Sequence, residues 1–251
     1  MKISFLIITW NGIELLKGCL ATLSSYLGRN DVEVIIVDNG SQDGTVEYLK
    51  AEHPTVKLIE LSTNKGVAVA RNKALKVAKG DYLFIIDNDL LLNDEAVEGM
   101  LQYMDGHPDV GLCGCKLLDI NGYVQPSAKQ YPGLTYKLKN LFFSGQYNYS
   151  YDLLSAKEPL EPVYLIGACQ LVRRKAFMMV GYLDEHIFYG PEDADFCIRM
   201  KEERWRVVYL PQYQMVHYCQ RVTNRRFFSL LGFRHIKGLL YFYWKHKKLI
   251  G

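Results

Sequence analysis

The chain has 251 residues, 49% of them hydrophobic, which is enough for one large α/β domain with a sizeable core and excludes global disorder. No apolar run approaches the roughly 20 residues of a membrane-spanning helix, and no cleavable signal peptide is recognised before the first strand. The net charge of +3 conceals an asymmetry. Residues 1–203 hold 20 Lys and Arg against 27 Asp and Glu, whereas residues 204–251 hold 10 Lys and Arg and no acidic residue. Such a basic tail indicates an anionic partner surface.

Strand and helix patterns alternate along the first 118 residues, with short connections between them. This alternation predicts a Rossmann-like, mostly parallel sheet with helices on both faces. In such sheets ligands bind beyond the carboxyl ends of the strands. The predicted strands are 2–9, 33–37, 56–61, 82–86, 110–117, 163–173 and 206–210, and the predicted helices are 14–27, 46–52, 65–79, 93–104, 175–180, 194–203 and 224–248.

Polar residues follow three of these strands directly. Thr9, Asp38 and Asp87 each fall at the carboxyl end of a predicted strand, so three distant segments converge on one edge of the sheet. The segment Asp87-Asn88-Asp89 follows five consecutive apolar residues. Two neighbouring carboxylates repel and are costly to bury unpaired, and a divalent cation removes both costs. The alternative for an isolated Asp-x-Asp is a strand end with a helix cap.

The second half of the chain has a less regular pattern. Asn121-Gly122 predicts a hairpin turn within residues 119–123. Residues 131–157 show no period, and we expect a long loop over the site. Glu192-Asp193 forms a second acidic pair at the start of a predicted helix, where the alternative is that both acids merely favour the helix dipole.

The basic tail predicts a helix with two distinct faces. Such a helix suits the interface of a membrane that carries anionic lipid, and the alternative is a helix docked on the domain or on a second subunit. Nucleic acid is not expected as a partner, because no reading motif accompanies the basic residues. The apolar face consists of Phe228, Leu231, His235, Leu239 and Phe242, and the basic face of Arg234, Lys237, Tyr241, Lys245 and Lys248.

The six cysteines predict neither a disulfide framework nor a zinc site. None forms a Cys-x-x-Cys pair, and Cys113-Gly114-Cys115 has the wrong spacing for zinc. We therefore expect reduced, mostly buried thiols in a cytoplasmic protein.

Taken in order, the motifs over residues 3–220 resemble the family 2 glycosyltransferases of the GT-A fold. Within that family the chain is most similar to bacterial rhamnosyltransferases of cell-surface polysaccharide assembly. The motifs are Ile8-Thr9-Trp10-Asn11, Val37-Asp38-Asn39-Gly40-Ser41-Gln42-Asp43-Gly44-Thr45, Asn64-Lys65-Gly66 with Ala70-Arg71-Asn72, Asp87-Asn88-Asp89, Gly190-Pro191-Glu192-Asp193-Ala194-Asp195, and His217.

The resemblance implies a metal-dependent, inverting enzyme. It would move a sugar from a UDP- or dTDP-sugar to a hydroxyl of a glycan or a polyprenyl-linked glycan. Residues 1–118 would form the nucleotide-sugar half, 119–220 the acceptor and catalytic half of the same domain, and 221–251 the basic tail. We expect the protein at the inner face of the plasma membrane, held peripherally by that tail.

The resemblance also assigns roles at the metal and at the acceptor. Asp89 would bind Mn²⁺ or Mg²⁺, and Asp87 would contact the metal through water or the donor ribose. His217 would complete the metal shell, although a lone histidine is often structural. Asp193 would be the general base, and Glu192 beside it would contact the acceptor.

For the donor, the resemblance implies that Asp38 accepts a hydrogen bond from the imide N–H of uracil or thymine. The alternative role of Asp38 is to cap the Asn39-Gly40 turn. Arg71 would lie near the base, with a solvated helix position as its alternative. The full donor-binding set is Thr9, Trp10, Asn11, Asp38, Asn39, Arg71, Asp87 and Asn88.

Two other functions compete with glycosyl transfer. A sugar-phosphate nucleotidyltransferase typically has a Gly-rich loop after its first strand, whereas this chain has the single Gly12 there. A non-catalytic module that binds nucleotide sugar or glycan would have no need of both acidic pairs.

Overall fold

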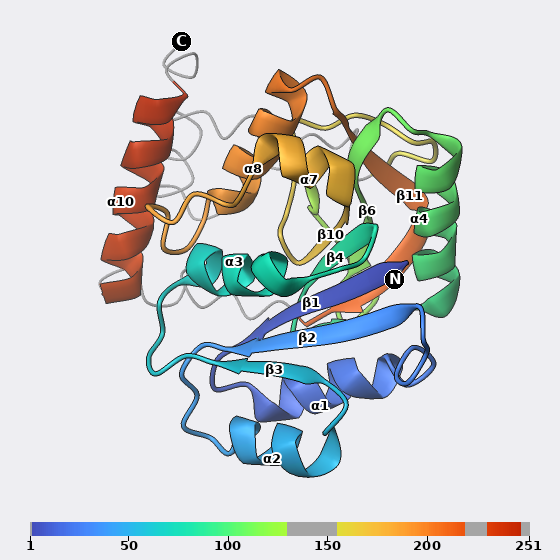
Figure 1. Ribbon diagram of the computed structural model, residues 1–251. Helices are drawn as coiled ribbons and strands as arrows, with labels where there is room; N and C mark the ends of the chain where they lie inside the picture. Colours follow the sequence, from blue (N-terminus) through green and yellow to red (C-terminus); the bar gives the residue numbers. More distant parts are fainter. Residues whose placement is uncertain (1, 130–154, 219–229, 247–251) are drawn as a thin grey trace.

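The computed structural model describes residues 2–129, 155–218 and 230–246 (Figure 1). A nine-stranded sheet runs in the order β3-β2-β1-β4-β10-β6-β11-β5, with β7 paired to β6. Strands β1 to β4 are parallel, β10 is antiparallel to both neighbours, and β6 and β11 are parallel to each other. The strands are β1 Ile3–Thr9, β2 Val32–Asp38, β3 Lys57–Glu60, β4 Tyr82–Asp87, β5 Leu90–Leu91, β6 Val110–Leu118, β7 Val124–Gln125, β8 Ala128–Lys129, β9 Tyr164–Leu165, β10 Cys169–Arg173 and β11 Arg206–His217.

Helices cover both faces of the sheet, as the sequence predicted. Successive strand residues face opposite sides, so Phe5 and Ile7 pack under α1, α2 and α4, while Leu6 packs under α3, α7, α8 and α10 (Figure 1). The helices are α1 Ile13–Thr22, α2 Thr45–Glu52, α3 Val67–Val77, α4 Asp94–Gly106, α7 Arg174–Val180, α8 Glu192–Glu202 and α10 Leu230–Lys245.

The strand register brings the predicted polar residues to one edge of the sheet. Thr9 pairs with Asp38 between β1 and β2, and Ile8 pairs with Asp87 between β1 and β4. The carboxyl ends of three parallel strands therefore lie side by side.

Three predicted elements differ from the observed ones. The helix predicted over 14–27 ends at Thr22, whose hydroxyl donates to the Cys19 carbonyl and accepts from the Leu92 amide, which holds the chain in turns from there to Gly28. The strand predicted over 163–173 is interrupted at residues 166–168. The strand predicted over 206–210 continues to His217 after a register shift that follows Leu210.

The predicted hairpin is confirmed. The Asp119 amide donates to the Tyr123 carbonyl, and Gly122 adopts the left-handed conformation that the turn requires, with φ of +83°. The loop predicted over 131–157 lies outside the described residues except for its last three. The described cysteines are all free and buried, as expected, and Cys219 lies outside the description.

Helix α10 docks on the domain, which was the alternative to a membrane contact, and the described part of the predicted apolar face packs inward; Phe228 of that face lies outside the described residues. Phe242 is fully buried in the core under α8, and Leu239 packs against the same core. His235 contacts the carbonyl oxygens of Tyr189 and Gly190 at 3.0 and 3.2 Å. Within the described ranges, no helix has both the length and the apolar character needed to cross a bilayer.

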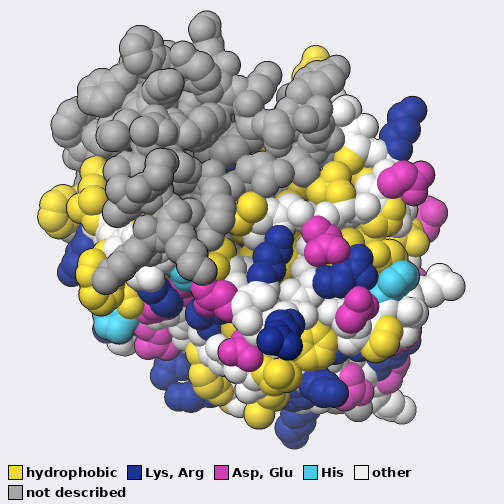
Figure 2. All heavy atoms as spheres, turned by 90° about the horizontal axis from the view of Figure 1, so that it is seen from above, with side chains coloured by type: hydrophobic (Ala, Val, Ile, Leu, Met, Phe, Trp, Pro, Cys, Tyr) yellow, Lys and Arg dark blue, Asp and Glu magenta, His cyan; other side chains and the backbone are white. Residues whose placement is uncertain are grey.

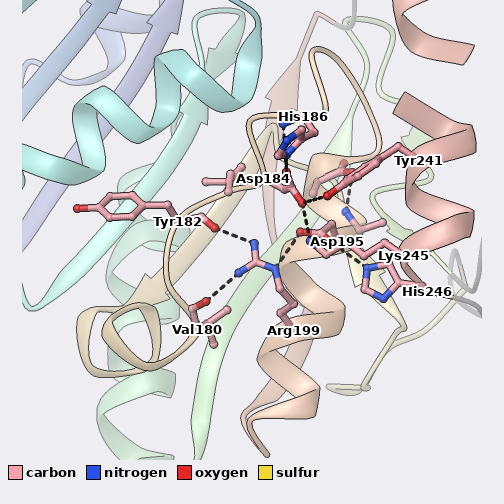
Figure 3. A network of polar contacts seen from close by, with 12 residues as sticks. Val180, Tyr182, Asp184, His186, Asp195, Arg199, Tyr241, Lys245 and His246 are labelled. Carbon is pink, nitrogen blue, oxygen red and sulfur yellow. Dashed lines mark hydrogen bonds and ion pairs between the residues drawn. The ribbon is translucent and has the colours of Figure 1, made fainter. Parts of the chain in front are cut away.

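A cluster of charges holds α10 against α8 (Figure 3). We call it the Asp195 cluster. Asp195 of α8 is fully buried, and its Oδ1 contacts Lys245 Nζ at 2.7 Å and His246 Nε2 at 2.8 Å. Lys245 also contacts Asp184 at 2.7 Å. Burial alone would raise the pKa of Asp195, but the hydrogen bond to His246 and the charge of Arg199 outweigh burial and lower it.

The Asp195 cluster predicts how α10 contributes to stability. Lys245→Met removes a cation shared by two carboxylates, of which Asp195 is fully buried, so we expect the free energy of unfolding to fall by about 1–3 kcal/mol. Lys237→Met, on an exposed position of the same helix, is the matched control and should change it by less than about 0.5 kcal/mol. Urea unfolding of both variants measures the difference, and equal values would contradict a stabilising role for the cluster.

Candidate active site

Asp87, Asp89 and His217 form a cluster at the carboxyl end of β4. Their ligand atoms all lie within 4.8 Å of one another, and His217 Nε2 lies 3.2 Å from Asp89 Oδ1. His217 is the last residue of β11 and pairs with Leu90 of β5, which fixes the imidazole beside the Asp-x-Asp segment. The structure thus brings together the three residues predicted to bind metal.

Burial and neighbouring charges shift the pKa values of Asp87 and His217 in this cluster. Burial raises the pKa of Asp87, Asp89 raises it further, and Arg71 opposes both. For His217, burial would lower the pKa, but the hydrogen bond to Asp89 and the charges of Asp89 and Asp87 raise it. Two carboxylates and one imidazole at this spacing have the composition of a divalent-cation site. A bound cation would replace the proton that the imidazole and the neighbouring carboxylate otherwise share.

Arg71 of α3 links this cluster to the second acidic pair. Its guanidinium is buried and donates from Nη2 to Asp87 Oδ1 at 2.7 Å and to the Gly167 carbonyl at 2.8 Å. Its Nη1 donates to Glu192 Oε1 at 3.2 Å. The alternative of a solvated helix position is therefore wrong. A Cβ at Gly167 would overlap the guanidinium, so a side chain there would force Arg71 to shift away from its partners.

Glu192, the first residue of α8, is buried with both carboxylate oxygens engaged. Oε1 accepts from Arg71, and Oε2 accepts from the Gly190 amide at 2.5 Å. Burial and the neighbouring charge of Asp193 raise the pKa of Glu192 to about 7, against the opposing effect of Arg71. In this arrangement the side chain positions Arg71 and the loop that precedes α8. The acceptor contact predicted for Glu192 stays a prediction.

Asp193 is only partly buried, and it contacts the backbone amide of Gly167, whose carbonyl binds Arg71. Its Oδ2 accepts from the Gly167 amide at 3.1 Å, and its Oδ1 accepts from the Ala194 amide at 2.8 Å. The two acidic pairs are therefore connected by a continuous series of contacts from Asp87 through Arg71 and Gly167 to Asp193. A carboxylate held by two backbone amides, with lone pairs still accessible, can accept a proton from a bound hydroxyl.

Asp38 offers an unpaired acceptor at the neighbouring strand end. Its Oδ2 accepts from the amides of Gly40 and Ser41 at 3.1 and 2.9 Å, which is the predicted turn cap. Its Oδ1 is buried and has no hydrogen-bond partner among the described residues. Asp38 and Gly40 line a hollow of about 480 Å³ together with Leu61 and Ser62. A buried acceptor without a partner is costly, which makes Oδ1 a candidate acceptor for a ligand.

Three asparagines hold the loops around this hollow. Asn88 donates to Thr9 Oγ1 at 3.0 Å and so joins the ends of β1 and β4. Asn11 accepts from the Gln42 amide at 2.7 Å, and Asn39 accepts from the Lys65 amide at 2.9 Å. These three predicted donor-binding residues thus connect neighbouring loops at this edge of the sheet.

Thr9 and Trp10 differ sharply in their exposure. Thr9 is buried beneath Asn88, whereas the indole of Trp10 is 51% exposed at the end of β1. Of the predicted donor-binding residues, Trp10 is the one that presents a large exposed surface on this rim.

Gln125 is a residue of the site that sequence reasoning missed. Its Nε2 donates to the His217 carbonyl at 2.6 Å, and its Oε1 lies 2.8 Å from His217 Nδ1. The predicted hairpin at 119–123 gives the register that pairs Gln125 with Leu117, but no feature of the sequence indicates that Gln125 meets a histidine 92 residues away.

The family model described as glycosyl transferase family 2 matches residues 4–181. The chain belongs to this family. The chain is 29% identical over 237 residues to the N-acetylglucosaminyl-diphospho-decaprenol L-rhamnosyltransferase of Mycobacterium tuberculosis. The match covers 88% of this chain and 77% of that protein. The chain is 28% identical to the poly(ribitol-phosphate) beta-glucosyltransferase of Bacillus spizizenii, over 84% of this chain and 34% of that protein.

Solved structures confirm the GT-A fold of this glycosyltransferase. TarS of S. aureus superposes with a TM-score of 0.62 at 21% identity, over 86% of this chain and 60% of that one. The mannosyltransferase PcManGT of Pyrobaculum calidifontis, solved with GDP-Man and Mn²⁺, superposes with a TM-score of 0.62 at 20% identity. The match covers 88% of this chain and 58% of that one. The chain therefore spans about 60% of the length of these solved proteins.

The raised pKa of Glu192 predicts a pH dependence of stability. In the folded chain this carboxyl keeps its proton up to about pH 7, whereas in the unfolded chain it loses the proton near its ordinary value of 4.5. Between these values the folded state binds more protons, so the free energy of unfolding falls as pH rises. Glu192→Gln removes this titration.

We therefore expect the stability of the wild type relative to Glu192→Gln to fall between about pH 4.5 and pH 7 and to level off above. Urea unfolding at half-unit steps of pH measures it. Glu202→Gln, at an exposed position of α8, is the control and should follow the wild type. Parallel curves for wild type and Glu192→Gln would show that Glu192 titrates normally.

Proposed function

We propose that this glycosyltransferase moves a sugar from a UDP- or dTDP-sugar to a hydroxyl of a lipid-linked or polymeric glycan, with a divalent cation and with inversion at the anomeric carbon. One observation carries the proposal: the contacts from Asp87 through Arg71 and Gly167 to Asp193. They support the proposal because they join Asp87, a candidate cation ligand, to Asp193, the candidate general base. Donor diphosphate and acceptor hydroxyl would meet between the two.

The residues present fit Mn²⁺ or Mg²⁺. Asp89 and His217 would hold the cation, with Asp87 bound directly or through water. When bound, such a cation neutralises the negative charge that develops on the leaving diphosphate. The structure of PcManGT with GDP-Man and Mn²⁺ supports this assignment, since that protein shares the fold.

The side chains of the second acidic pair account for inversion. Asp193 would accept the proton of the attacking hydroxyl from the side opposite the diphosphate, and a single displacement of this kind inverts the anomeric configuration. Glu192 would keep Arg71 in place. Arg71 in turn donates to Asp87 and to the Gly167 carbonyl, so it would hold the cation cluster and the second acidic pair at a fixed spacing.

The donor base is proposed from Asp38. Its unpaired Oδ1 matches the imide N–H of uracil or thymine, which presents a donor at that edge, whereas cytosine presents an acceptor there. TarS has been solved in complex with UDP and with UDP-GlcNAc, which supports a uridine donor for a chain of this fold.

The acceptor is proposed to be an intermediate of cell-envelope polysaccharide. The M. tuberculosis relative is named for a decaprenol-linked acceptor, and the B. spizizenii relative for a poly(ribitol-phosphate) acceptor. An acceptor carried on a polyprenyl diphosphate would place the enzyme at the inner face of the plasma membrane.

A membrane contact through the tail is proposed from the outer face of α10. Phe233, Leu240 and Trp244 are each more than 60% exposed and follow one stripe of the helix, with exposed Lys237 between them. At the left edge of Figure 2, where α10 lies, hydrophobic side chains stand beside basic ones. This stripe is not the one that the sequence predicted, and it stays exposed when α10 is docked.

The central test is metal-dependent turnover. Asp89→Asn removes a charged ligand, so we expect transfer from UDP- or dTDP-sugars to fall by roughly 100-fold or more, because a bound cation stabilises the transition state by several kcal/mol. Glu52→Gln, an exposed change on α2, is the control. The anomeric proton coupling of the product reports inversion. Full activity of Asp89→Asn in the presence of chelator, or retained configuration, would contradict the proposal.

Asp38→Asn tests the base preference. The two backbone amides hold an oxygen in the position of Oδ2, so the new amide NH₂ must occupy the position of Oδ1. It would then face the imide N–H of uracil, donor against donor, and UDP affinity should fall by roughly 10- to 100-fold. CDP affinity should rise, because cytosine accepts at that position. Calorimetric titrations of the wild type and Asp38→Asn with UDP and CDP measure both affinities. An unchanged ratio of UDP to CDP affinity would show that Asp38 does not contact the base.

The membrane contact is tested with a triple variant, Phe233→Ser, Leu240→Ser and Trp244→Ser. We expect co-sedimentation with vesicles containing anionic lipid to fall by roughly 10-fold or more, since each side chain contributes apolar area to the interface. The control is Met178→Ser with Met179→Ser, which removes exposed apolar side chains from α7. If only the control weakened binding, α10 would not be the contact.

A further inference from the structure

The backbone carbonyl of His217 fixes the orientation of the Gln125 side-chain amide. The amide of Gln125 spans two groups of the same histidine, with one end 2.6 Å from the His217 backbone carbonyl and the other 2.8 Å from His217 Nδ1. A backbone carbonyl oxygen only accepts hydrogen bonds, so the NH₂ end of Gln125 must face it. The oxygen end of Gln125 is then the one that faces Nδ1.

This orientation determines which imidazole nitrogen carries hydrogen. An amide oxygen only accepts, so His217 Nδ1 must be the donor. The other nitrogen, Nε2, lies 3.2 Å from Asp89 Oδ1 and within the cluster that includes Asp87. Without a cation, Nε2 shares a proton with Asp89. Once a cation replaces that proton, Nε2 offers a lone pair while Nδ1 keeps its hydrogen.

The position of Gln125 is itself well fixed. Gln125 is buried, and β7 pairs it with Leu117 across the hairpin. Its backbone carbonyl accepts from the Ser127 amide at 2.8 Å. The side chain therefore approaches His217 from a strand whose register is set by the turn at Gly122.

We propose that Gln125 is a positioning residue that holds His217 as the Nδ1–H tautomer and so presents the lone pair of Nε2 to a cation. The proposal rests on the proposed function for the presence of that cation. Ligating histidines bind best when their second nitrogen donates to an oxygen, because this hydrogen bond fixes both the tautomer and the ring orientation.

Two substitutions separate positioning from structural support. Gln125→Leu and Gln125→Glu both lose the hydrogen bond to the His217 carbonyl, but Gln125→Glu keeps an oxygen acceptor for Nδ1–H. A purely structural role predicts that the two variants behave alike. The proposal predicts that Gln125→Glu keeps the Nδ1–H tautomer and that Gln125→Leu does not.

The first measurement is the tautomer of His217 in metal-free protein. The reference chain and both Gln125 variants carry Asp89→Ala here, because the Asp89 carboxylate would otherwise compete for the imidazole proton at Nε2. ¹⁵N-labelled histidine is observed by long-range ¹H–¹⁵N correlation at a pH at which the imidazole is neutral, and the signals are assigned by their loss in His217→Ala. We expect Nδ1–H in the reference chain and with Gln125→Glu. An Nε2–H reference chain, or the same tautomer with Gln125→Leu as in the reference chain, would overturn the proposal.

The second measurement is calorimetric titration with Mn²⁺. We expect the affinity of Gln125→Leu to be lower by roughly 10- to 100-fold than that of the wild type, as for other partners of ligating histidines. Equal affinity would overturn the proposal. If the wild type bound no Mn²⁺, the proposed metal dependence would fail, while the tautomer measurement would still decide whether Gln125 sets the state of His217. If Gln125→Leu did not fold, the tautomers of the reference chain and of Gln125→Glu would decide it.

Discussion

The buried guanidinium of Arg71 is the interaction on which the rest of the site depends. It touches Asp87 at the end of β4, Glu192 at the start of α8, and the carbonyl of Gly167 between β9 and β10. These are three separate parts of the chain. Loss of one partner from a buried ion pair costs about 3–5 kcal/mol, because the remaining charge stays desolvated. The arrangement therefore constrains all three elements at once, and with them the spacing between the two acidic pairs.

Polar side chains also join the loops that lie next to the Arg71 contacts. Asn88 ties the end of β4 to that of β1, and Asn39 ties the end of β2 to the turn that enters α3. On the far side, the Asp195 cluster holds α8 against α10 (Figure 3). A diphosphate sugar and its acceptor would thus meet in a site whose charged groups are already oriented, and such preorganisation is a main source of catalytic power in enzymes.

Much of this arrangement could be predicted from the sequence, because it follows from local patterns. Apolar runs that end in Thr9, Asp38 and Asp87 predict strands, and parallel strands end on one side of a sheet. The hairpin followed from Asn121-Gly122. Long-range side-chain contacts could not be predicted in this way. Gly167 meets Arg71 across 96 positions, and Gln125 meets His217 across 92, and neither contact leaves a periodic signal.

The packing of the tail helix also depends on long-range contacts that the sequence does not reveal. Helix α10 carries two apolar stripes, one with Leu239 and Phe242 and one with Phe233, Leu240 and Trp244. Periodicity alone does not say which stripe packs inward. The choice is explained by Lys245, because it must face Asp184 and Asp195, which the sequence does not place beside the tail.

The central claim is that the Asp-x-Asp segment and His217 hold a cation beside the nucleotide diphosphate. Crystals grown with UDP and Mn²⁺, measured at the manganese absorption edge, test it most directly. The account predicts one anomalous peak within bonding distance of Asp89 and His217 Nε2, in contact with both phosphates of UDP. Bound UDP with no peak there, or with manganese at any other group of residues, would contradict it.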